Sequence, residues 1–356
     1  MESTSFISKT APPISYKTSW RAPSNIALVK YWGKYGAQLP KNPSLSFTLS
    51  SSTSETSVVF TPHSKSTTDF EFYFHKVLKE DFKPKVANFL ERIRPFIPWI
   101  GKFHLEIHSE NSFPHSSGIA SSASSMAALS LCLMDLERQL FPEITNLYFH
   151  QKASFLARLG SGSAARSIQG PVTLWGKNNT QRTSSDIYAT PFGDSLHSIF
   201  KTYQDTILLV DKGSKSVSSS LGHDLMHGHP FAENRFSQAT KHLSSLISIM
   251  EAGALDDFMR IVELEALSLH SMMMTSSPYF ILMQPNTLAI IQKVLAYRES
   301  TSIPLCFTLD AGANLHLLYP HENKESVLIF IKKELSIFCE NEQYLLDEVG
   351  IGAKKI

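Results

Sequence analysis

Residues 160–167 read GSGSAARS, a stretch of small side chains with a single charge at Arg166. A guanidinium offers a fork of N–H donors that fits a carboxylate or a phosphate. Ser161 and Ser163 add hydroxyl groups, and the glycines let a ligand come close to the backbone. Apolar runs flank this stretch on both sides, which is unusual for a flexible linker. The pattern indicates an anion-binding site, although a tight turn that caps the next element would have the same composition.

A second stretch, residues 112–131, reads SFPHSSGIASSASSMAALSL and leads from a loop into a helix. The unpaired N–H groups and the dipole at a helix N-terminus favour an anion, and Gly118 would let a phosphate approach the backbone. The stretch therefore predicts a phosphate cradle, with a serine-capped, closely packed helix as the open alternative. Neither G-x-x-x-x-G-K-[ST] nor G-x-G-x-x-G occurs in the chain.

Two further stretches end in charged residues. Lys30 and Lys34 lie four apart in NIALVKYWGK, where a lysine at a strand end either meets a phosphate or is an ordinary solvated edge residue. Asp310 ends the apolar run in TLDAGAN. An aspartate before Ala-Gly is usually a turn former, but at a strand end it can also serve as a general base.

Three histidines, His223, His227 and His229, lie in HDLMHGH and raise the question of a metal site. No cysteine or paired carboxylate joins them, and the H-E-x-x-H motif is absent. A solvated loop or helix end is therefore the favoured interpretation.

Strands and helices must position these residues. The strict alternation of residues 102–110 predicts a half-buried strand with Phe103, Leu105 and Ile107 on one face. The Ser- and Thr-rich residues 45–60 predict two short strands and a turn. Residues 1–17 are polar and expected to be loosely held. Further strands are expected at 24–32, 69–77, 171–176, 205–211 and, around a tight turn, 305–319, and helices at 82–97, 119–139, 144–159, 231–251, 254–274, 286–298 and 324–335.

The order of these elements has no regular βαβ rhythm, which predicts an α+β fold with a boundary near residue 200. A length of 356 residues favours two domains, and 42% apolar residues supply packed cores. A net charge of +1 gives no indication of a nucleic-acid or membrane partner. Three widely spaced cysteines in apolar runs, with no apolar signal or membrane-spanning run, predict a soluble cytoplasmic protein.

Taken in their order, these motifs resemble the diphosphomevalonate decarboxylase family of the GHMP kinase superfamily. The resemblance runs from residue 18 to residue 350 and rests on APSNIALVKYWGK with NPSLSFTLS, ENSFPHSSGIASSAS, ARLGSGSAARSIQG, VSSSLGHDLM and FTLDAGAN. It implies a homodimer with the two-domain GHMP kinase fold. The expected parts are an extension at residues 1–17, a ribosomal protein S5 domain 2-like ATP-binding domain at residues 18–200, and a ferredoxin-like α/β sandwich at residues 201–356.

The resemblance also implies an activity. Such an enzyme takes (R)-5-diphosphomevalonate and ATP with Mg²⁺, phosphorylates the 3-hydroxyl, and loses phosphate and CO₂ to give isopentenyl diphosphate. Asp310 would be the base or orienting acceptor at the 3-hydroxyl, Arg166 would hold the carboxylate end, and Lys30 would meet the substrate's phosphates. The other expected substrate residues are Tyr31, Ser161, Ser163 and Ser219. The expected ATP residues are Asn111, Pro114, Gly118, Ala120, Ser121, Ser122 and Ser124, with the metal arriving on ATP.

The chain departs from the family pattern at two places that bear on ligands. His115, Ser116 and Ser117 stand where Thr-Ala-Ala is usual, which bears on nucleotide affinity. Pro43 replaces a usual serine near the expected substrate site. A related decarboxylase or 3-kinase that acts on 5-phosphomevalonate or mevalonate is therefore the alternative.

Overall fold

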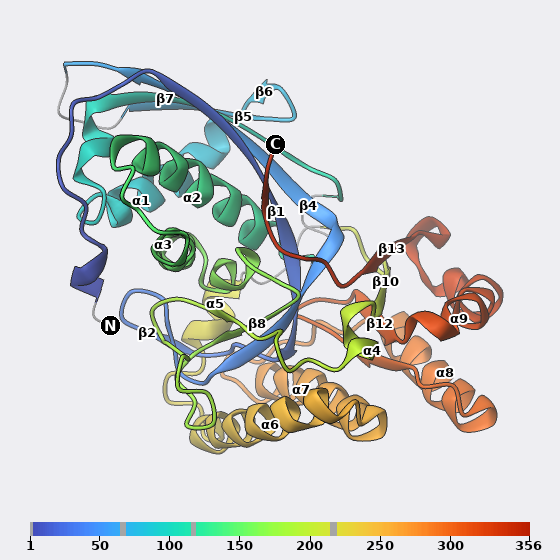
Figure 1. Cartoon of the computed structure of the whole chain (residues 1–356). Coiled ribbons are helices and arrows are strands. Elements are labelled where there is room, and N and C mark those ends of the chain that lie inside the picture. The colour runs from blue at the N-terminus through green and yellow to red at the C-terminus, as the bar shows by residue number, and fades with distance from the viewer. Residues whose placement is uncertain (1–2, 65–68, 115–118, 214–218) are drawn as a thin grey trace.

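The structure, a computed structural model, describes residues 3–64, 69–114, 119–213 and 219–356. It contains two larger sheets with their helices and a short hairpin, which confirms the α+β class (Figure 1). The first sheet has the order β14-β1-β4-β7-β5-β6, with β8 paired to β4 and β9 to β8. The second sheet has the order β11-β12-β10-β13.

The first sheet is covered by three helices, which lie together beneath it in Figure 1. Its strands are β1 (Tyr16–Val29), β4 (Ser44–Pro62), β5 (Asp69–Phe74), β6 (Val77–Leu78), β7 (Phe103–Asn111), β8 (Val172–Trp175), β9 (Thr190–Pro191) and β14 (Lys354–Lys355). The helices are α1 (Lys83–Ile93), α2 (Ser121–Leu140) and α3 (Asn146–Gly160). In β7 the predicted face, Phe103, Leu105 and Ile107, is fully buried.

The prediction of two short strands and a turn at residues 45–60 is wrong, because β4 is one continuous strand. Its pairing with β1 shifts between Asn25, opposite Thr48, and Pro23, opposite Thr53. The extra residues of β4 form a bulge there, and the carboxylate of Asp347 accepts hydrogen bonds from the N–H groups of Ser50, Ser51 and Ser52. This carboxylate satisfies backbone donors that the bulge leaves without a partner on β1, so the strand bends without ending.

The N-terminal residues are also held more firmly than their polarity predicts. Phe6 lies in a 3₁₀ turn, is 0% exposed, and stacks on Phe155 with 4.9 Å between ring centroids. The N–H of Ser8 donates to the carbonyl of Phe96. One buried aromatic side chain thus outweighs the polar composition around it.

The second sheet consists of β10 (Gln204–Leu208), β11 (Cys306–Thr308), β12 (Leu315–Tyr319) and β13 (Tyr344–Glu348). Its half of the chain also contains α4 (Ser198–Lys201), α5 (Ser219–Asp224), α6 (Ala232–Ala252), α7 (Leu255–Met274), α8 (Pro285–Thr301) and α9 (Lys324–Phe330). Helix α7 packs against both β11 and β1, so it joins the two sheets. Helix α9 is shorter than predicted because a π-helical turn takes over at Ile331–Leu335.

The two ends of the chain meet in the first sheet. Trp20 and Arg21 of β1 pair with Lys355 and Lys354 of β14. The ammonium of Lys355 lies 2.6 Å from the carboxylate of Asp135 on α2. The short hairpin, β2 (Lys34–Tyr35) and β3 (Leu39–Pro40), lies between β1 and β4 in sequence.

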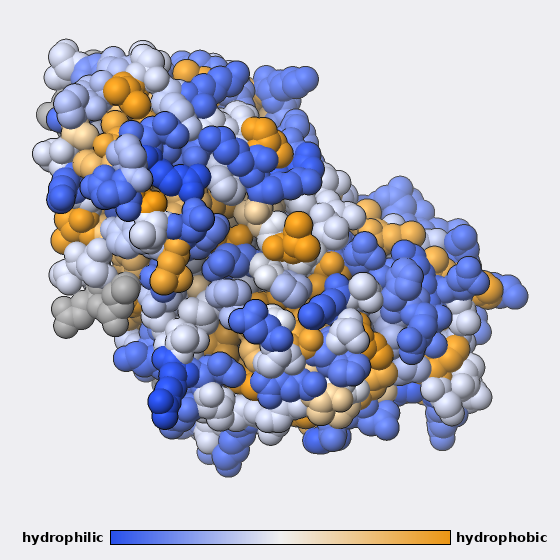
Figure 2. All heavy atoms as spheres, in the orientation of Figure 1, coloured by the Kyte–Doolittle hydropathy of each residue, from blue (hydrophilic) through white to orange (hydrophobic). Residues whose placement is uncertain are grey.

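The surface of the molecule is mixed in polarity. On the face shown in Figure 2, apolar residues are scattered in small groups among polar ones, which is normal for a folded protein. No helix in the described part of the chain is long and apolar enough to cross a membrane.

Candidate active site

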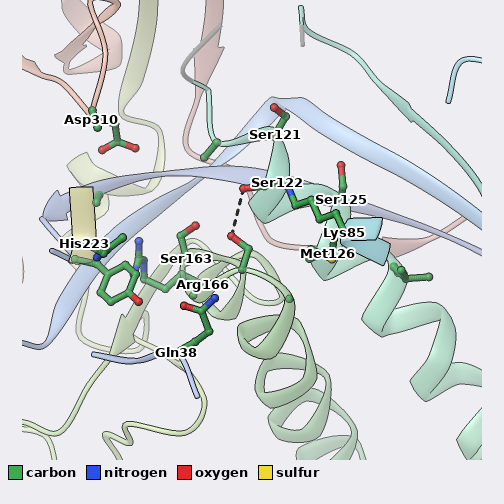
Figure 3. A pocket seen from close by; sticks show the side chains of 18 of the residues that line it. Gln38, Lys85, Ser121, Ser122, Ser125, Met126, Ser163, Arg166, His223 and Asp310 are labelled. Atoms are coloured by element: carbon green, nitrogen blue, oxygen red, sulfur yellow. Dashed lines mark hydrogen bonds between the residues drawn. The ribbon is translucent and has the colours of Figure 1, made fainter. Parts of the chain in front are cut away.

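A cavity of about 620 Å³ brings together the sequence stretches that were singled out for chemistry. Its walls come from the residues after β1, the start of α2, the segment after α3, helix α5 and the turn between β11 and β12 (Figure 3). The predicted residues that line it are Lys30, Tyr31, Ala120, Ser121, Ser122, Ser161, Ser163, Arg166 and Asp310. Residues far apart in sequence therefore form one site.

Lys30 and Asp310 form an ion pair within this cavity. The ammonium lies 2.9 Å from Oδ1 of Asp310, and the side chains are 1% and 30% exposed, respectively. Burial lowers the pKa of Lys30 below its ordinary value, and the charge and hydrogen bond of Asp310 offset part of that shift. Asp310 thus presents a carboxylate to the cavity while a buried cation fixes its orientation.

Behind this pair lies a buried carboxylate that the sequence analysis missed. Oε2 of Glu265 accepts the backbone N–H of Lys30 at 2.9 Å, and Arg235 and His242 donate to the same carboxylate at 2.5 and 2.6 Å. Burial alone would raise the pKa of Glu265, but these hydrogen bonds and the charge of Arg235 hold it below its ordinary value. The spacing of Phe258, Val262, Glu265 and Leu269 was the available signal, since it places a charge on the apolar face of a helix.

His270 holds the other side of Asp310. Burial lowers the pKa of His270 to about 4, so the ring is neutral near pH 7. Its Nε2 donates to the backbone carbonyl of Asp310 at 3.1 Å. Backbone and side chain of Asp310 are therefore each fixed by a separate buried group.

Arg166 is almost fully buried, and the strand that packs beside it aims its guanidinium. Nε donates to Oγ of Ser46 at 2.5 Å and Nη1 donates to Oγ of Ser44 at 2.7 Å. Burial lowers the pKa of Arg166 from its ordinary value, and Asp310 partly offsets this, so the group stays charged near pH 7. With two arms held by β4, the third nitrogen remains for a ligand in the cavity.

The small residues around Arg166 serve close packing as well as ligand access. A Cβ on Gly162 would lie 2.7 Å from the hydroxyl of Tyr31, and one on Gly160 would lie 2.7 Å from the sulfur of Met126. Asn25 on β1 donates to the carbonyl of Ser163 at 3.2 Å and fixes the turn. The glycines of GSGSAARS therefore leave the space beside the backbone that Tyr31 and Met126 occupy, and both of these side chains line the cavity.

The start of α2 forms the next wall. Ala120 precedes it with φ 47° and ψ 39°, a left-handed conformation that is uncommon for alanine, and no side chain caps the helix. Ser122 shares a hydrogen bond of 3.3 Å with Ser161, shown as the dashed line in Figure 3. Uncapped N–H groups and two hydroxyls at a helix N-terminus suit a phosphate.

Other predicted ATP residues lie elsewhere. Ser124 is fully buried behind the cavity and, with Asn111, hydrogen-bonds the hydroxyl of Ser54, whereas Ser125 lines the cavity. Pro114 is exposed and does not line it. Three sets of residues lie outside what the structure describes: Gly118, residues 115–117, which depart from the family pattern, and the side chain of Ser219.

The far end of the cavity is apolar, and the sequence analysis did not anticipate it. It is lined by Phe72, Phe74, Phe82, Val86, Ile107, Met126 and Leu129. These residues belong to β5, the 3₁₀ turn that ends at Phe82, α1, β7 and α2, whose individual patterns read only as core. A flat apolar group would fit between such side chains.

The varied residue Pro43 lies at the edge of this site. It does not line the cavity, and a Cβ on Gly176 would lie 2.5 Å from its Cα. The adjacent Asn42 donates to the carbonyl of Lys30 at 3.0 Å. Pro43 thus packs beside Gly176 and directly precedes the strand β4, which carries Ser44 and Ser46.

Two further groups point to a ligand. The hydroxyl of Tyr31 is buried and has no partner among the described residues. His223, for which a solvated loop or helix end was the favoured prediction, is instead buried and lines the same cavity. No group of three or more His, Cys, Asp or Glu residues in the described ranges is arranged to hold a metal ion. Asp310 with nearby hydroxyls instead resembles sites where Mg²⁺ is held largely by phosphates.

Comparison with known proteins gives the chain its relatives. The family model of the diphosphomevalonate decarboxylase-like N-terminal domain matches residues 22–187, and that of the mevalonate 5-diphosphate decarboxylase C-terminal domain matches residues 206–351. Diphosphomevalonate decarboxylase mvd1 of Aspergillus fumigatus is 28% identical over 333 residues, which are 89% of this chain and 80% of that protein.

Solved structures agree over nearly the whole chain. MDDEF in complex with MVAPP, AMPPCP and magnesium has a TM-score of 0.81 at 28% identity, covering 96% of this chain and 99% of that one. Mevalonate diphosphate decarboxylase from Staphylococcus aureus has a TM-score of 0.82 at 27% identity, covering 96% and 98%. The arrangement of both halves of the chain is thus shared with these structures.

Proposed function

The chain belongs to the diphosphomevalonate decarboxylase family, and from this premise we propose how its residues carry out the family's reaction. The activity is the ATP- and Mg²⁺-dependent decarboxylation of mevalonate diphosphate. The observation that carries the proposal is the Lys30–Asp310 pair, which shares one cavity with Arg166 and the uncapped start of α2.

The first step is phosphoryl transfer to the 3-hydroxyl. Asp310 accepts the hydroxyl proton or orients the hydroxyl, and Lys30 keeps that carboxylate in place. The N–H groups at the start of α2, with Ser121 and Ser122, hold the phosphates of ATP. Such a reaction needs positioning and charge neutralisation more than covalent help from the protein.

The second step is loss of the 3-phosphate and CO₂. The C–O bond breaks with its electron pair on the departing phosphate, and the C–C bond to the carboxylate supplies the pair for the new double bond. Arg166, whose guanidinium is oriented by Ser44 and Ser46, binds and orients the carboxylate. Ser161 and Ser163 line the same part of the cavity and hold the carboxylate end of the substrate together with Arg166. Lys30 and Tyr31, with Lys34 close by, face the anionic end of the substrate.

The ligands divide the cavity between them. Mg²⁺ would arrive mainly bound to ATP and would supply neutralisation of the phosphate charge, with Asp310 and the serine hydroxyls of the cavity as the available oxygen ligands. The apolar end, with Phe72 and Met126, accepts the base of the nucleotide. Asn111, Pro114, Gly118, Ala120 and Ser124 stay as predicted members of the ATP site, and Ser219 of the substrate site.

Three further expectations concern the domain boundary, the cellular compartment and the oligomeric state. A boundary near residue 200 would separate an ATP-binding domain from a C-terminal domain, and limited proteolysis would test it. The three cysteines are free and buried, as in a reducing compartment such as the cytoplasm, where cell fractionation should find the protein. The family resemblance supports a homodimer, which light scattering during gel filtration would detect.

The decisive test is an assay of purified protein with ATP and Mg²⁺ against mevalonate, 5-phosphomevalonate and 5-diphosphomevalonate separately. ADP, phosphate and CO₂ should appear in equal amounts from the diphosphate. CO₂ release mainly from the monophosphate would keep the mechanism and change the substrate. ADP without CO₂ would make the protein a kinase and overturn the role of Arg166.

A further inference from the structure

His223 occupies a position in the cavity that the proposed mechanism leaves unused. Its ring centroid lies 4.3 Å from that of Tyr31 and 4.8 Å from that of Trp32, and the residue is only 8% exposed. A Cβ on the preceding Gly222 would lie 2.4 Å from the indole of Trp32. The imidazole is thus clamped by two aromatic rings, and a glycine permits that close packing.

The hydrogen bonding of the ring determines which nitrogen faces the ligand. Nδ1 of His223 accepts the backbone N–H of Gly33 at 3.0 Å. Burial lowers the pKa of His223 to about 3, and the nearby cations Lys34 and Arg166 add to this shift. A neutral imidazole that accepts at Nδ1 carries its proton on Nε2. No described residue accepts from that Nε2–H group.

The position of the ring indicates the ligand group. In the view of Figure 3, His223 lies on one side of Ser163, and Ser121 and Ser122 lie on the other. The start of α2 is where ATP phosphates are expected, so His223 faces the opposite part of the cavity, which it lines together with Lys34 and Gln38. An anionic oxygen there would find cations and one rigid neutral donor.

We propose that His223 is a substrate-binding residue that donates its Nε2–H to an oxygen of the substrate's diphosphate. The inference rests on the proposed function and adds a contact to it. The lysine and arginine side chains supply charge, while the clamped imidazole supplies direction, because its N–H cannot turn. A donor of this kind contributes to recognition of the phosphate end rather than to the chemical steps.

Two substitutions separate the donor from the packing. In His223→Asn the side-chain oxygen can still accept the Gly33 N–H, but no donor reaches the former Nε2 position. In His223→Gln the longer amide can return a donor to that position. His229→Asn is the matched control, because His229 is an equally buried imidazole that bonds the Phe231 N–H and the Met272 carbonyl and does not line the cavity.

The measurements are steady-state KM values for 5-diphosphomevalonate and for ATP, together with calorimetric binding of 5-diphosphomevalonate alone. His223→Asn should raise KM and Kd for the diphosphate about 10- to 100-fold, the range for losing a hydrogen bond to a charged group. KM for ATP should stay nearly unchanged, His223→Gln should recover part of the loss, and His229→Asn should bind substrate normally.

Three results would overturn the inference. They are an unchanged diphosphate KM in His223→Asn, an equal loss in His229→Asn, and a loss confined to ATP. Calorimetry in buffers of different ionisation heat adds a fourth. If wild-type protein takes up about one proton more per substrate than His223→Asn, the ring binds as a cation and the neutral donor is wrong. Wild-type protein that releases no CO₂ would overturn the proposed function itself, whereas active wild type with an unaffected variant removes only His223.

Discussion

The two ends of the cavity are built on opposite physical principles. Around Asp310, the charged groups of Lys30, Arg166 and Glu265 are withdrawn from water, and each is held by hydrogen-bonded partners. Around Phe72, the walls are mostly aromatic and aliphatic side chains from β5, α1 and the turn before it, β7 and α2. Fixed charges that face reacting atoms act on rates, because their orientation is set before the substrate arrives. Apolar walls act on binding, because they gain by removing a ligand surface from water.

Asp310→Asn should therefore give the largest effect in the molecule. The amide keeps the size of the side chain but cannot accept the hydroxyl proton, and we expect kcat to fall by about 10²- to 10⁴-fold. Steady-state release of ADP and CO₂ measures this. Asp211→Asn, which removes an exposed carboxylate just beyond β10, should leave kcat unchanged. An Asp310→Asn protein with near wild-type turnover would remove Asp310 from the mechanism.

Glu265→Gln should have an intermediate effect that reaches the site only through Lys30. We expect kcat to fall by about 10- to 100-fold, the size of effect seen for residues that orient a site from behind. Loss of the negative charge should also lower the pKa of Lys30 further, since Glu265 now favours its charged form. The alkaline limb of the kcat–pH profile should thus move to lower pH.

The neighbouring carboxylate provides the matched control for this shift. Glu263 lies on the same helix and pairs with Arg298, away from Lys30. Glu263→Gln should leave the alkaline limb in place, even if it lowers Tm. If kcat of Glu265→Gln is lower at every pH but the alkaline limb of its kcat–pH profile does not shift, Glu265 supports the fold and not the ionisation of Lys30.

The smallest effect is expected at the apolar end. Phe72→Ala removes one aromatic wall, and we expect KM for ATP to rise about 2- to 10-fold, the range for losing an aromatic contact, with kcat nearly unchanged. Tyr73 is adjacent on β5 and stacks on His108 instead of lining the cavity. Tyr73→Ala should therefore keep the wild-type KM. A fall in kcat for Phe72→Ala would mean that the apolar end also acts on the rate, which would contradict the division between the two ends.

The sequence predicted the polar end far better than the apolar end. Asp310, Arg166 and Ser122 occur in stretches whose glycines, serines and lone charges are unusual, so the residue types themselves point to anion chemistry. Phe72 and Ile107 carry no such mark, because an apolar wall of a ligand site has the same composition as a core. Glu265 was hidden for a different reason: its role depends on a backbone N–H more than two hundred residues away.

The fold was predicted well where local patterns decide and less well where distant groups do. The alternation of β7 and the small-residue helix α2 follow from their own residues. The continuity of β4 does not, since the carboxylate of Asp347 satisfies its bulge from the far end of the chain. Phe6 was missed because its contact, Phe155, is equally remote.

The pairing of β14 with β1 has a consequence for biosynthesis. The residues of β1 leave the ribosome long before those of β14, so the first sheet has an open edge at Trp20 and Arg21 until β14 has been made. Such an edge can recruit another nascent strand. The residues of β14 therefore close this edge only late in synthesis, and a product that lacks them would leave the edge exposed to quality control.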